Sequence, residues 1–295
     1  MGSRILAISD LHVDSRMNAN WVEALSTSDY VDDVLILAGD VSDNPERMKR
    51  AFECLTSRFR RVIFVPGNHE LWVRGQDERS SVGKFHQVLG LCKSMGVGTE
   101  PEHVLDVSGK EVVIVPLFSW YSQPEQDPLD SLYLTKKGED PTLSMWSDRR
   151  FVRDDLDVRD LSAFFLKLNK ERVEMAYDNQ VISFSHFLPR QELIFSNGPP
   201  GAISGGDPYP SFNFSRVAGS AGLDRQVRTL GSRLHVYGHH HRNRNLEIEG
   251  VTYISHCLGY PQERTSGRIL GLKFGPRLVW DGASVADKSA GVAAG

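Results

Sequence analysis

The stretch DVLILAGDVSD at residues 33–43 joins a run of aliphatic residues to a glycine and two further aspartates. Such a short apolar run is typical of a buried β-strand, and Gly39 permits a sharp turn directly after it. The same arrangement occurs upstream, as RILAISDLH at residues 4–12, and downstream, as RVIFVPGNHE at residues 61–70. Each predicted strand therefore ends beside polar side chains that can bind metal.

Further apolar runs extend this pattern through most of the chain. The predicted strands cover residues 4–9, 33–38, 61–65, 111–117, 180–185, 233–237 and 251–255. Apolar residues at helical spacing predict helices from Pro45 onward, around 80–95 and over 157–177, with Asp43 or Asn44 as the cap of the first. Alternating strands and helices predict an α/β fold whose central strands are covered on both faces.

Two long segments interrupt the alternation of strands and helices. Residues 119–157 and 191–221 are rich in Pro, Gly, Asp and Ser, and loops of this length inside a compact domain are usually functional. We interpret them as insertions on the substrate side of a single domain at residues 1–282. The small and polar residues 283–295 predict a flexible tail.

The chain has 295 residues, and 34 Lys and Arg against 38 Asp and Glu give a formal net charge of −4. This balance argues against a broad electropositive surface, so nucleic acid is not an expected partner. No stretch approaches the roughly 20 apolar residues that cross a bilayer, and the N-terminus does not resemble a signal peptide. With only three scattered cysteines, the sequence predicts a cytoplasmic protein without a membrane partner.

Side chains that can bind metal follow most of the predicted strands. They are Asp10, His12, Asp40, Asn68, His69, His186 and the run His239 to His241. The carboxyl ends of strands in α/β sheets converge on one edge, so residues far apart in the sequence can meet there. Carboxylate, amide oxygen and imidazole ligands suit hard or borderline divalent metals. An aspartate that bridges two ions about 3.5–4 Å apart suits phosphate-ester hydrolysis.

The order of these motifs resembles that of the calcineurin-like metallophosphoesterase family. The matching blocks are DLH at 10–12, GDVSD at 39–43, GNHE at 67–70, His186 and GHHH at 238–241. They extend over most of the chain in the order that the family has. The resemblance implies a four-layer αββα sandwich with two mixed β-sheets, and hydrolysis of a phosphate ester.

The resemblance also implies a pair of metal ions. The first ion is expected on Asp10, His12, Asp40 and His241, and the second on Asp40, Asn68, His186 and His239. Asp40 would bridge the two ions. Manganese, iron and zinc all suit this ligand set, so the identity of the metals stays open. His240 belongs to neither set, and we expect it to face away from the metals, with contact to the substrate as the alternative.

His69 resembles the family histidine that donates a proton to the departing alkoxide. Imidazole suits this role because it titrates near neutral pH. Asp43 stands where the family often places a carboxylate that orients this histidine. Capping of the following helix is the alternative role for Asp43, and the two roles are compatible.

Substrate contacts are expected from residues beside the ligand motifs. Trp120 and Tyr121 follow a predicted strand and would form an aromatic wall near the metals, with core packing as the alternative. Arg242 and Arg244 lie just beyond the last ligands and would bind phosphate oxygens, with a surface position as the alternative.

The leading hypothesis is hydrolysis of a phosphomonoester or phosphodiester. Asn44 stands where the family's protein phosphatases usually carry an arginine, so a small molecule or nucleotide is favoured over a phosphoprotein. The alternatives are a catalytically silent scaffold, which the filled ligand positions disfavour, and a nuclease, which the acidic charge balance disfavours.

Overall fold

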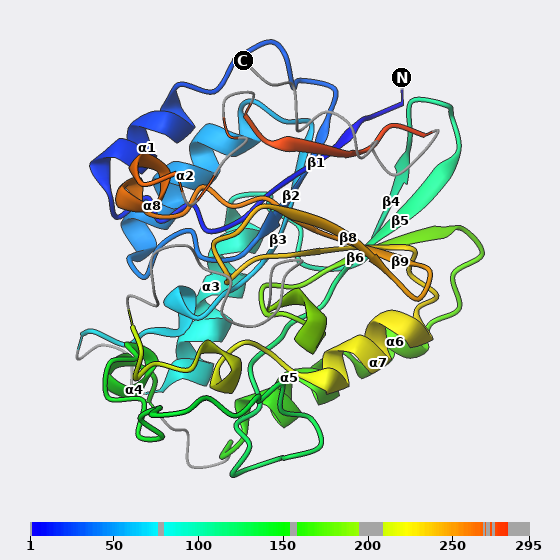
Figure 1. Ribbon diagram of the computed structural model, residues 1–295. Helices are drawn as coiled ribbons and strands as arrows, with labels where there is room; N and C mark the ends of the chain where they lie inside the picture. Colours follow the sequence, from blue (N-terminus) through cyan, green and yellow to red (C-terminus); the bar gives the residue numbers. More distant parts are fainter. Residues whose placement is uncertain are drawn as a thin grey trace.

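The computed structural model describes residues 2–75, 80–153, 158–194, 209–267, 269, 272 and 275–282. Two β-sheets lie face to face in it, with helices on their outer sides (Figure 1). The predicted tail at 283–295 and part of each predicted insertion lie outside the described residues. In the described part of the chain, no helix has the length and apolar character needed to span a membrane.

The first sheet has four strands. Their order is β10 (Arg277–Trp280), β1 (Ile5–Ile8), β2 (Val34–Ala38) and β3 (Arg61–Val65). The strands β1, β2 and β3 are parallel, and β10 pairs with β1 in the antiparallel direction. This sheet is therefore mixed, and the carboxyl ends of its three parallel strands share one edge.

The second sheet has six strands. Their order is β4 (Glu102–Leu105), β5 (Glu111–Pro116), β6 (Gln180–Phe184), β7 (Leu234–Tyr237), β9 (Val251–Ser255) and β8 (Arg244–Ile248). The four inner strands are parallel, whereas β4 and β8 pair antiparallel at the two edges. The expected α/β sandwich with two mixed sheets is confirmed.

Helices cover the outer face of each sheet. The helices on the first sheet are α1 (Arg16–Glu23), α2 (Pro45–Thr56) and α3 (Ser81–Ser94), and those on the second are α5 (Leu161–Leu168), α6 (Lys170–Glu174) and α7 (Ala221–Thr229). The short helices are α4 (Asp148–Phe151), α8 (Pro261–Thr265), and the 3-10 turns η1 (His69–Leu71), η2 (Gln191–Leu193) and η3 (Phe214–Arg216). The four layers seen in Figure 1 are thus helix, sheet, sheet and helix.

The central core lies between the sheets. Alternate side chains of β2, such as Ile36, meet Ile114 and Ile182 of the second sheet in one buried apolar cluster, while the other side chains of β2 pack under α2 and α3. Both faces of the inner strands are therefore buried, which explains their nearly continuous apolar sequences.

The sequence patterns did not predict strands β4, β8 and β10 or helices α1, α4, α7 and α8, and they predicted one helix where the structure has two. Strands β4, β8 and β10 lie at sheet edges and are partly exposed, so they lack a continuous apolar run. The helix expected over 157–177 is instead α5 and α6, which meet at Asn169. The buried Asn169 side chain binds both the backbone N–H and the carbonyl of Phe118, at 3.0 and 2.8 Å. This contact favours a break in the helix at that point.

Phe85 of α3 tests how far the buried aromatic cluster stabilises the fold. Its fully buried ring contacts Phe118 and Phe165 edge-on, with centroids 5.1 and 5.0 Å away. We expect Phe85→Ala to lower the free energy of unfolding by about 3–5 kcal/mol, because it leaves a cavity in the core. Urea denaturation measures this loss. The neighbouring His86 is exposed, so His86→Ala should leave the midpoint nearly unchanged.

Candidate metal centre

The carboxyl ends of strands from both sheets meet at one place. The loop after β1 is joined to the loop after β2 by a hydrogen bond from the Asp10 N–H to the Gly39 carbonyl, at 2.9 Å. The loop after β7 is joined to the loop after β6 by a bond of 2.9 Å from the Gly238 N–H to the His186 carbonyl. Residues that are distant in the sequence are therefore held side by side.

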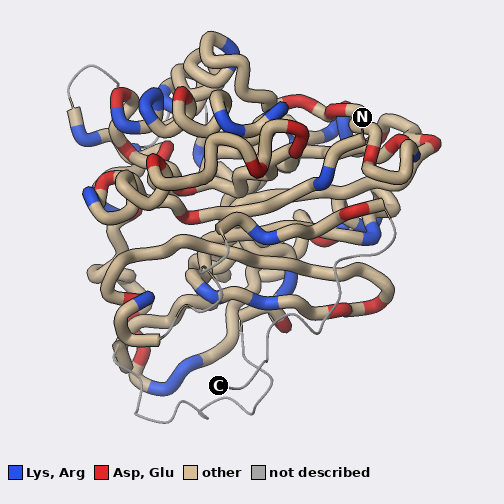
Figure 2. The backbone as a smooth tube through the Cα atoms, turned by 90° about the horizontal axis from the view of Figure 1, so that it is seen from above, with Lys and Arg blue, Asp and Glu red and all other residues tan. Residues whose placement is uncertain are grey.

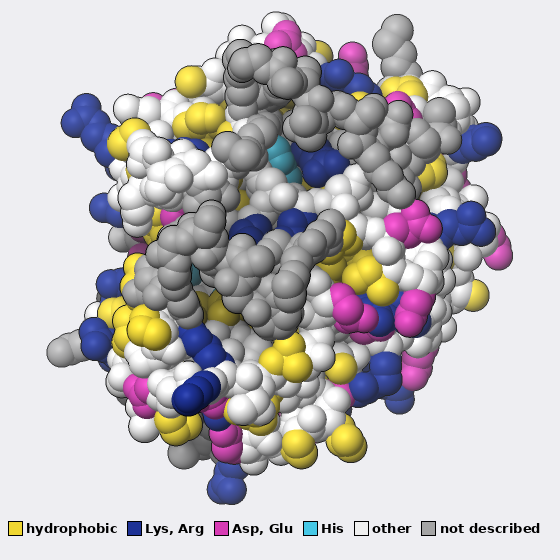
Figure 3. Space-filling view, in the orientation of Figure 1, with side chains coloured by type: hydrophobic (Ala, Val, Ile, Leu, Met, Phe, Trp, Pro, Cys, Tyr) yellow, Lys and Arg dark blue, Asp and Glu magenta, His cyan; other side chains and the backbone are white. Residues whose placement is uncertain are grey.

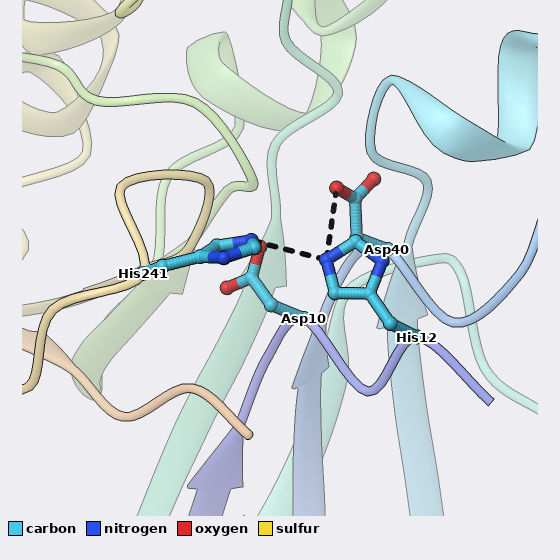
Figure 4. A group of neighbouring side chains, drawn as sticks. All are labelled: Asp10, His12, Asp40 and His241. Atoms are coloured by element: carbon cyan, nitrogen blue, oxygen red, sulfur yellow. Dashed lines mark hydrogen bonds and ion pairs between the residues drawn. The ribbon is translucent and has the colours of Figure 1, made fainter. Parts of the chain in front are cut away.

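Two groups of side chains at this junction have the composition of metal sites. One group is Asp10, His12, Asp40 and His241, and the other is Asp40, His186 and His239; within each group the possible ligand atoms lie within 4.8 Å of one another. Figure 4 shows the first group converging from the ends of β1, β2 and β7. Asp40 belongs to both groups, as a bridging ligand must.

Imidazole and carboxylate atoms face each other closely in the first group. The Nε2 atoms of His12 and His241 are 3.0 Å apart (Figure 4). His241 Nε2 lies 3.3 Å from Asp10 Oδ1, and His12 Nε2 lies 3.8 Å from Asp40 Oδ2. Donor atoms from four side chains thus surround one point.

Asn68 completes the second group. The Nε2 atom of His186 lies 3.5 Å from Asp40 Oδ2 and 3.2 Å from the Asn68 Oδ1 atom. His186 and His239 contact each other edge to face, with ring centroids 5.1 Å apart. The structure therefore brings together every residue that the sequence analysis assigned to a metal.

Three of the histidines are held by groups outside the cluster. His186 Nδ1 lies 2.9 Å from the Ala38 carbonyl, and His239 Nε2 lies 2.9 Å from the Val217 carbonyl. His241 Nδ1 lies 2.7 Å from Glu263 Oε2. Because a carbonyl can only accept, the nitrogen beside it carries the proton, which leaves the other ring nitrogen as a lone-pair donor toward the cluster.

The electrostatics of the cluster favour a bound cation. Burial, together with the negative charges of Glu70 and Asp10, raises the pKa of the Asp40 carboxyl well above its ordinary value. Burial opposes a charge on His241, but the Asp10 and Glu263 carboxylates outweigh it and raise the pKa of His241 to about 10. A cation at this point would replace the proton and satisfy both the carboxylates and the facing imidazole nitrogens. The donor set therefore fits divalent metal ions.

The backbone is strained at these residues. Asp10, His12, Asp40, His239 and His241 all have positive φ angles, between 42° and 69°. Only Leu143 and Glu249 share this property among the non-glycine residues of the described chain. Positive φ is unfavourable for residues with a Cβ atom and clusters at functional sites. The unfavourable backbone conformations thus occur at the residues whose side chains form the candidate metal centre.

Two glycines allow the loops to approach the ligands. Gly39 has a φ of +81°, which favours glycine, and it directly precedes Asp40. A Cβ atom on Gly67 would lie 2.8 Å from the His186 ring. Both positions therefore need glycine, as the sequence suggested for Gly39.

Glu70 joins the loops after β2 and β3. Its fully buried carboxylate accepts hydrogen bonds from the backbone N–H groups of Gly67 at 2.6 Å, Asp40 at 2.9 Å, Val41 at 2.7 Å and Ser42 at 3.0 Å. Burial raises the pKa of Glu70 to about 7, although these hydrogen bonds oppose that change. Glu70 ends the GNHE motif at residues 67–70, but its role in joining the loops is not evident from the sequence.

His69 lies at the rim of the cluster. Its ring packs on Trp72, with centroids 3.6 Å apart, and its Nε2 atom lies 3.8 Å from Asp40 Oδ2 and 3.4 Å from the Tyr260 hydroxyl. Tyr260 also stacks on His12 with centroids 4.4 Å apart. Burial and the neighbouring imidazoles hold the pKa of His69 well below its ordinary value.

Asp43 lies close to this rim but has other partners. Its carboxylate forms an ion pair with the Arg74 side chain, and its carbonyl accepts from Lys84 Nζ at 2.6 Å. No hydrogen bond or ion pair joins Asp43 to His69, although the structure describes both residues. Asn44, and not Asp43, caps α2 through a bond of 3.1 Å from the Arg47 N–H.

The expected substrate contacts lie mostly in packed positions. Trp120 and Tyr121 are 6% and 8% exposed and pack against Phe187 in the core, as in the alternative considered for them. Arg244 begins β8, where its Nη1 atom donates to the Leu193 carbonyl at 2.8 Å. Arg242 lies between His241 and β8 and is half-buried.

His240 lies outside both metal groups, as expected. Its ring stacks on Phe214 with centroids 4.7 Å apart, and its Nδ1 atom is buried without a hydrogen-bond partner in the described chain.

The surface carries charges of both signs. In the view of Figure 2, basic and acidic residues are interspersed along the chain, in agreement with the net charge of −4. On the face shown in Figure 3, outside the atoms drawn in grey, histidine side chains occupy only small areas. The candidate ligands Asp10, His12 and His186 are accordingly at most 1% exposed.

Comparisons with known proteins agree with this geometry. The model of a protein family described as calcineurin-like phosphoesterase matches residues 3–243. Over 120 residues the chain is 40% identical to the acyl-carrier-protein phosphodiesterase PptH of Mycobacterium tuberculosis, a match that covers 39% of this chain and 36% of that relative. The crystal structure of phosphopantetheinyl hydrolase (PptH) from Mycobacterium tuberculosis has the same fold, with a TM-score of 0.65 and 23% identity over 90% of this chain and 92% of that one.

The role of Glu70 in joining the two loops leads to a prediction. Glu70→Gln replaces one of two acceptor oxygens by an NH₂ group that faces backbone N–H donors. We expect the free energy of unfolding to fall by about 2–4 kcal/mol, because buried backbone donors lose an acceptor oxygen and face an NH₂ group instead. Urea denaturation measures this change. Glu46→Gln, at an exposed position in the first turn of α2, is the matched control, and an equal loss in both variants would contradict the role of Glu70.

Proposed function

Because the chain belongs to the calcineurin-like phosphoesterase family, whose members are metal-dependent hydrolases, we propose that it cleaves a phosphodiester with two metal ions in the candidate metal centre. The observation that carries this proposal is the pair of ligand groups that share Asp40. A single-ion site would need no second group of buried donors beside Asp40.

The proposed ligands follow from the two groups. Asp10, His12, Asp40 and His241 would hold one ion, and Asp40, Asn68, His186 and His239 the other. Bound in this way, the ions would polarise a phosphoryl oxygen and lower the pKa of water so that it attacks phosphorus at neutral pH. Manganese, iron and zinc all accept nitrogen and oxygen ligands of these kinds.

His69 is the proposed general acid. Its side chain is 11% exposed and lies beside Asp40, at the boundary between the ligand cluster and solvent. Trp72 packs on one side of its ring, and the Tyr260 hydroxyl lies beside Nε2. These contacts limit the orientations open to the imidazole. The negative charge of a bound ester would favour its protonated form, which offsets the effect of burial.

The proposed substrate is a carrier protein that bears phosphopantetheine through a phosphodiester bond. The support is the 40% identity to the acyl-carrier-protein phosphodiesterase PptH, over 36% of the length of that relative. In the proposed reaction a water oxygen bonds to phosphorus and gives up a proton to solvent, the bond from phosphorus to the hydroxyl oxygen of the carrier breaks, and His69 gives a proton to the departing alkoxide. The products are the unmodified carrier protein and phosphopantetheine.

The role of His69 can be tested by comparing leaving groups. An alkyl alkoxide needs a proton as it departs, whereas a nitrophenolate is stable without one. We expect His69→Ala to lower kcat about 10²–10⁴-fold for an alkyl phosphodiester and much less for bis(4-nitrophenyl) phosphate, with unchanged metal content. Equal losses on both esters would refute the role of general acid. Asp40→Asn, which alters the bridging ligand, should instead lower both rates together with the bound metal.

The substrate proposal is tested with the modified carrier protein itself. Incubation with the manganese-loaded protein should convert it to the unmodified carrier and release phosphopantetheine, both seen by mass spectrometry. The Asp40→Asn variant should not do so. Turnover of bis(4-nitrophenyl) phosphate without any turnover of the carrier would reject this substrate and leave the phosphodiesterase activity standing. Cleavage of DNA that is lost in Asp40→Asn would point to a nuclease instead.

A further inference from the structure

A buried carboxylate from a distant loop lies behind the candidate metal centre. Asp148 begins the short helix α4, within the long segment that interrupts the strands, and is 3% exposed. It is absent from both groups of candidate metal ligands. Its position is 80 residues from Asn68, the nearest residue of the centre in contact with it. No sequence motif marks it.

Four side chains of the described residues donate hydrogen bonds to this carboxylate. Asp148 Oδ1 accepts from the Asn68 amide nitrogen Nδ2 at 2.9 Å and from the Trp72 indole N–H at 2.6 Å. Asp148 Oδ2 accepts from the Trp146 indole N–H at 2.8 Å, and the Tyr121 hydroxyl is a further donor. The carboxylate therefore has its acceptor positions filled, as a buried carboxylate requires.

Three of these donors, Asn68, Trp72 and Trp146, each contact a different histidine of the centre. The other end of the Asn68 amide, Oδ1, lies 3.2 Å from His186 Nε2. Trp72 packs on the His69 ring, with centroids 3.6 Å apart. Trp146 contacts the His239 ring edge to face, with centroids 5.8 Å apart. Asp148 thus contacts Asn68 directly. Through the indoles of Trp146 and Trp72 it also supports the rings of His239 and of His69, the proposed acid.

The chemistry of an amide shows why the contact with Asn68 matters. The oxygen of an asparagine side chain can bind a cation, whereas its NH₂ group can only donate. A half-turn of the amide would place NH₂ at the metal and the oxygen against Asp148, where two acceptors would face each other. The carboxylate therefore favours the one orientation in which Oδ1 faces the cluster.

We propose that Asp148 is a positioning residue for the second metal ion, because it fixes the Asn68 amide with its oxygen toward that ion. The proposal rests on the binding of two ions proposed above. It assigns to the segment around 119–157 a part in building the metal centre, in addition to any contact with substrate. Groups behind the ligands commonly change metal affinity about 10–100-fold when they are removed.

The variant Asp148→Asn tests this proposal with almost no change in volume. An amide at 148 can pair with Asn68 in either orientation, so it no longer selects Oδ1 for the metal. We expect the affinity for the second Mn²⁺ to fall about 10–100-fold, with the first Mn²⁺ retained. Calorimetric titration with Mn²⁺ measures both steps. The electron paramagnetic resonance signal should change from a coupled manganese pair to a single ion.

Asp106→Asn is the matched control. Asp106 is also fully buried, and it accepts from the Trp280 indole N–H at 3.1 Å and from the Ser108 N–H at 2.9 Å. It lies beside the edge strands β4 and β10, and it belongs to neither metal group. This variant should keep both Mn²⁺ affinities. A loss of the second ion in both variants alike would overturn the proposal, since any buried carboxylate would then have the same effect.

An exchange of the two side chains gives an independent test. Asn68→Asp alone places two carboxylates in contact and should weaken the second Mn²⁺ site. In Asn68→Asp with Asp148→Asn, the amide at 148 can donate to the new carboxylate at 68. We expect this double variant to bind the second Mn²⁺ at least tenfold more tightly than Asn68→Asp alone. This comparison does not require that Asp148→Asn itself folds.

The outcomes separate this proposal from the proposed function. If the wild-type protein binds only one Mn²⁺, the two-ion function fails and this proposal fails with it. If the wild type binds two ions and Asp148→Asn binds both with unchanged affinity, only the role of Asp148 is refuted. Failure of the double variant to improve on Asn68→Asp would refute it as well.

Discussion

The buried carboxylate of Asp40 is the constraint on which the rest of this structure depends. It is 2% exposed and belongs to both groups of candidate metal ligands. A negative charge at such a position is costly unless hydrogen bonds or a neighbouring positive charge compensate it. The imidazoles around it, the loop contacts made by Glu70 and the positive φ of Asp40 itself all serve to hold it there. The position of Asp40 therefore depends on the fold, and the geometry of the candidate metal centre depends on Asp40.

The inner strands and the candidate ligands could be predicted from the sequence for the same reason. A strand buried on both faces needs a continuous apolar run, and the polar residue that ends such a run stands out, as Asp10 and Asp40 do. Strands at the sheet edges, such as β8, are half exposed and carry mixed residues, so no simple pattern marks them. The break at Asn169 depends on a contact with Phe118, which spacing along the chain does not reveal.

The groups that contact the candidate ligands from behind could not be predicted from the sequence. Glu263, Asp148 and the Val217 carbonyl each hold one ligand side chain, yet none of them belongs to a motif. They reach the centre from α8 and from the two long loop segments, whose paths follow from packing and not from periodicity. Asp43 shows the converse, since its place in a motif suggested His69 as a partner, whereas the folded chain pairs it with Arg74.

The left-handed backbone at Asp10, His12, Asp40, His239 and His241 limits which residues can replace the ligands. Among residues with a side chain, Asn, Asp and His adopt this conformation most readily, and glycine adopts it freely. The residue types that tolerate a positive φ are thus nearly the same as those that can bind these metals. A descendant of this chain that no longer bound metal would still favour Asp, Asn or Gly at these positions, simply to keep its turns. A distant homologue that keeps only Asp, Asn or Gly at these turns is therefore weaker evidence of catalysis than one that keeps every candidate ligand, histidines included.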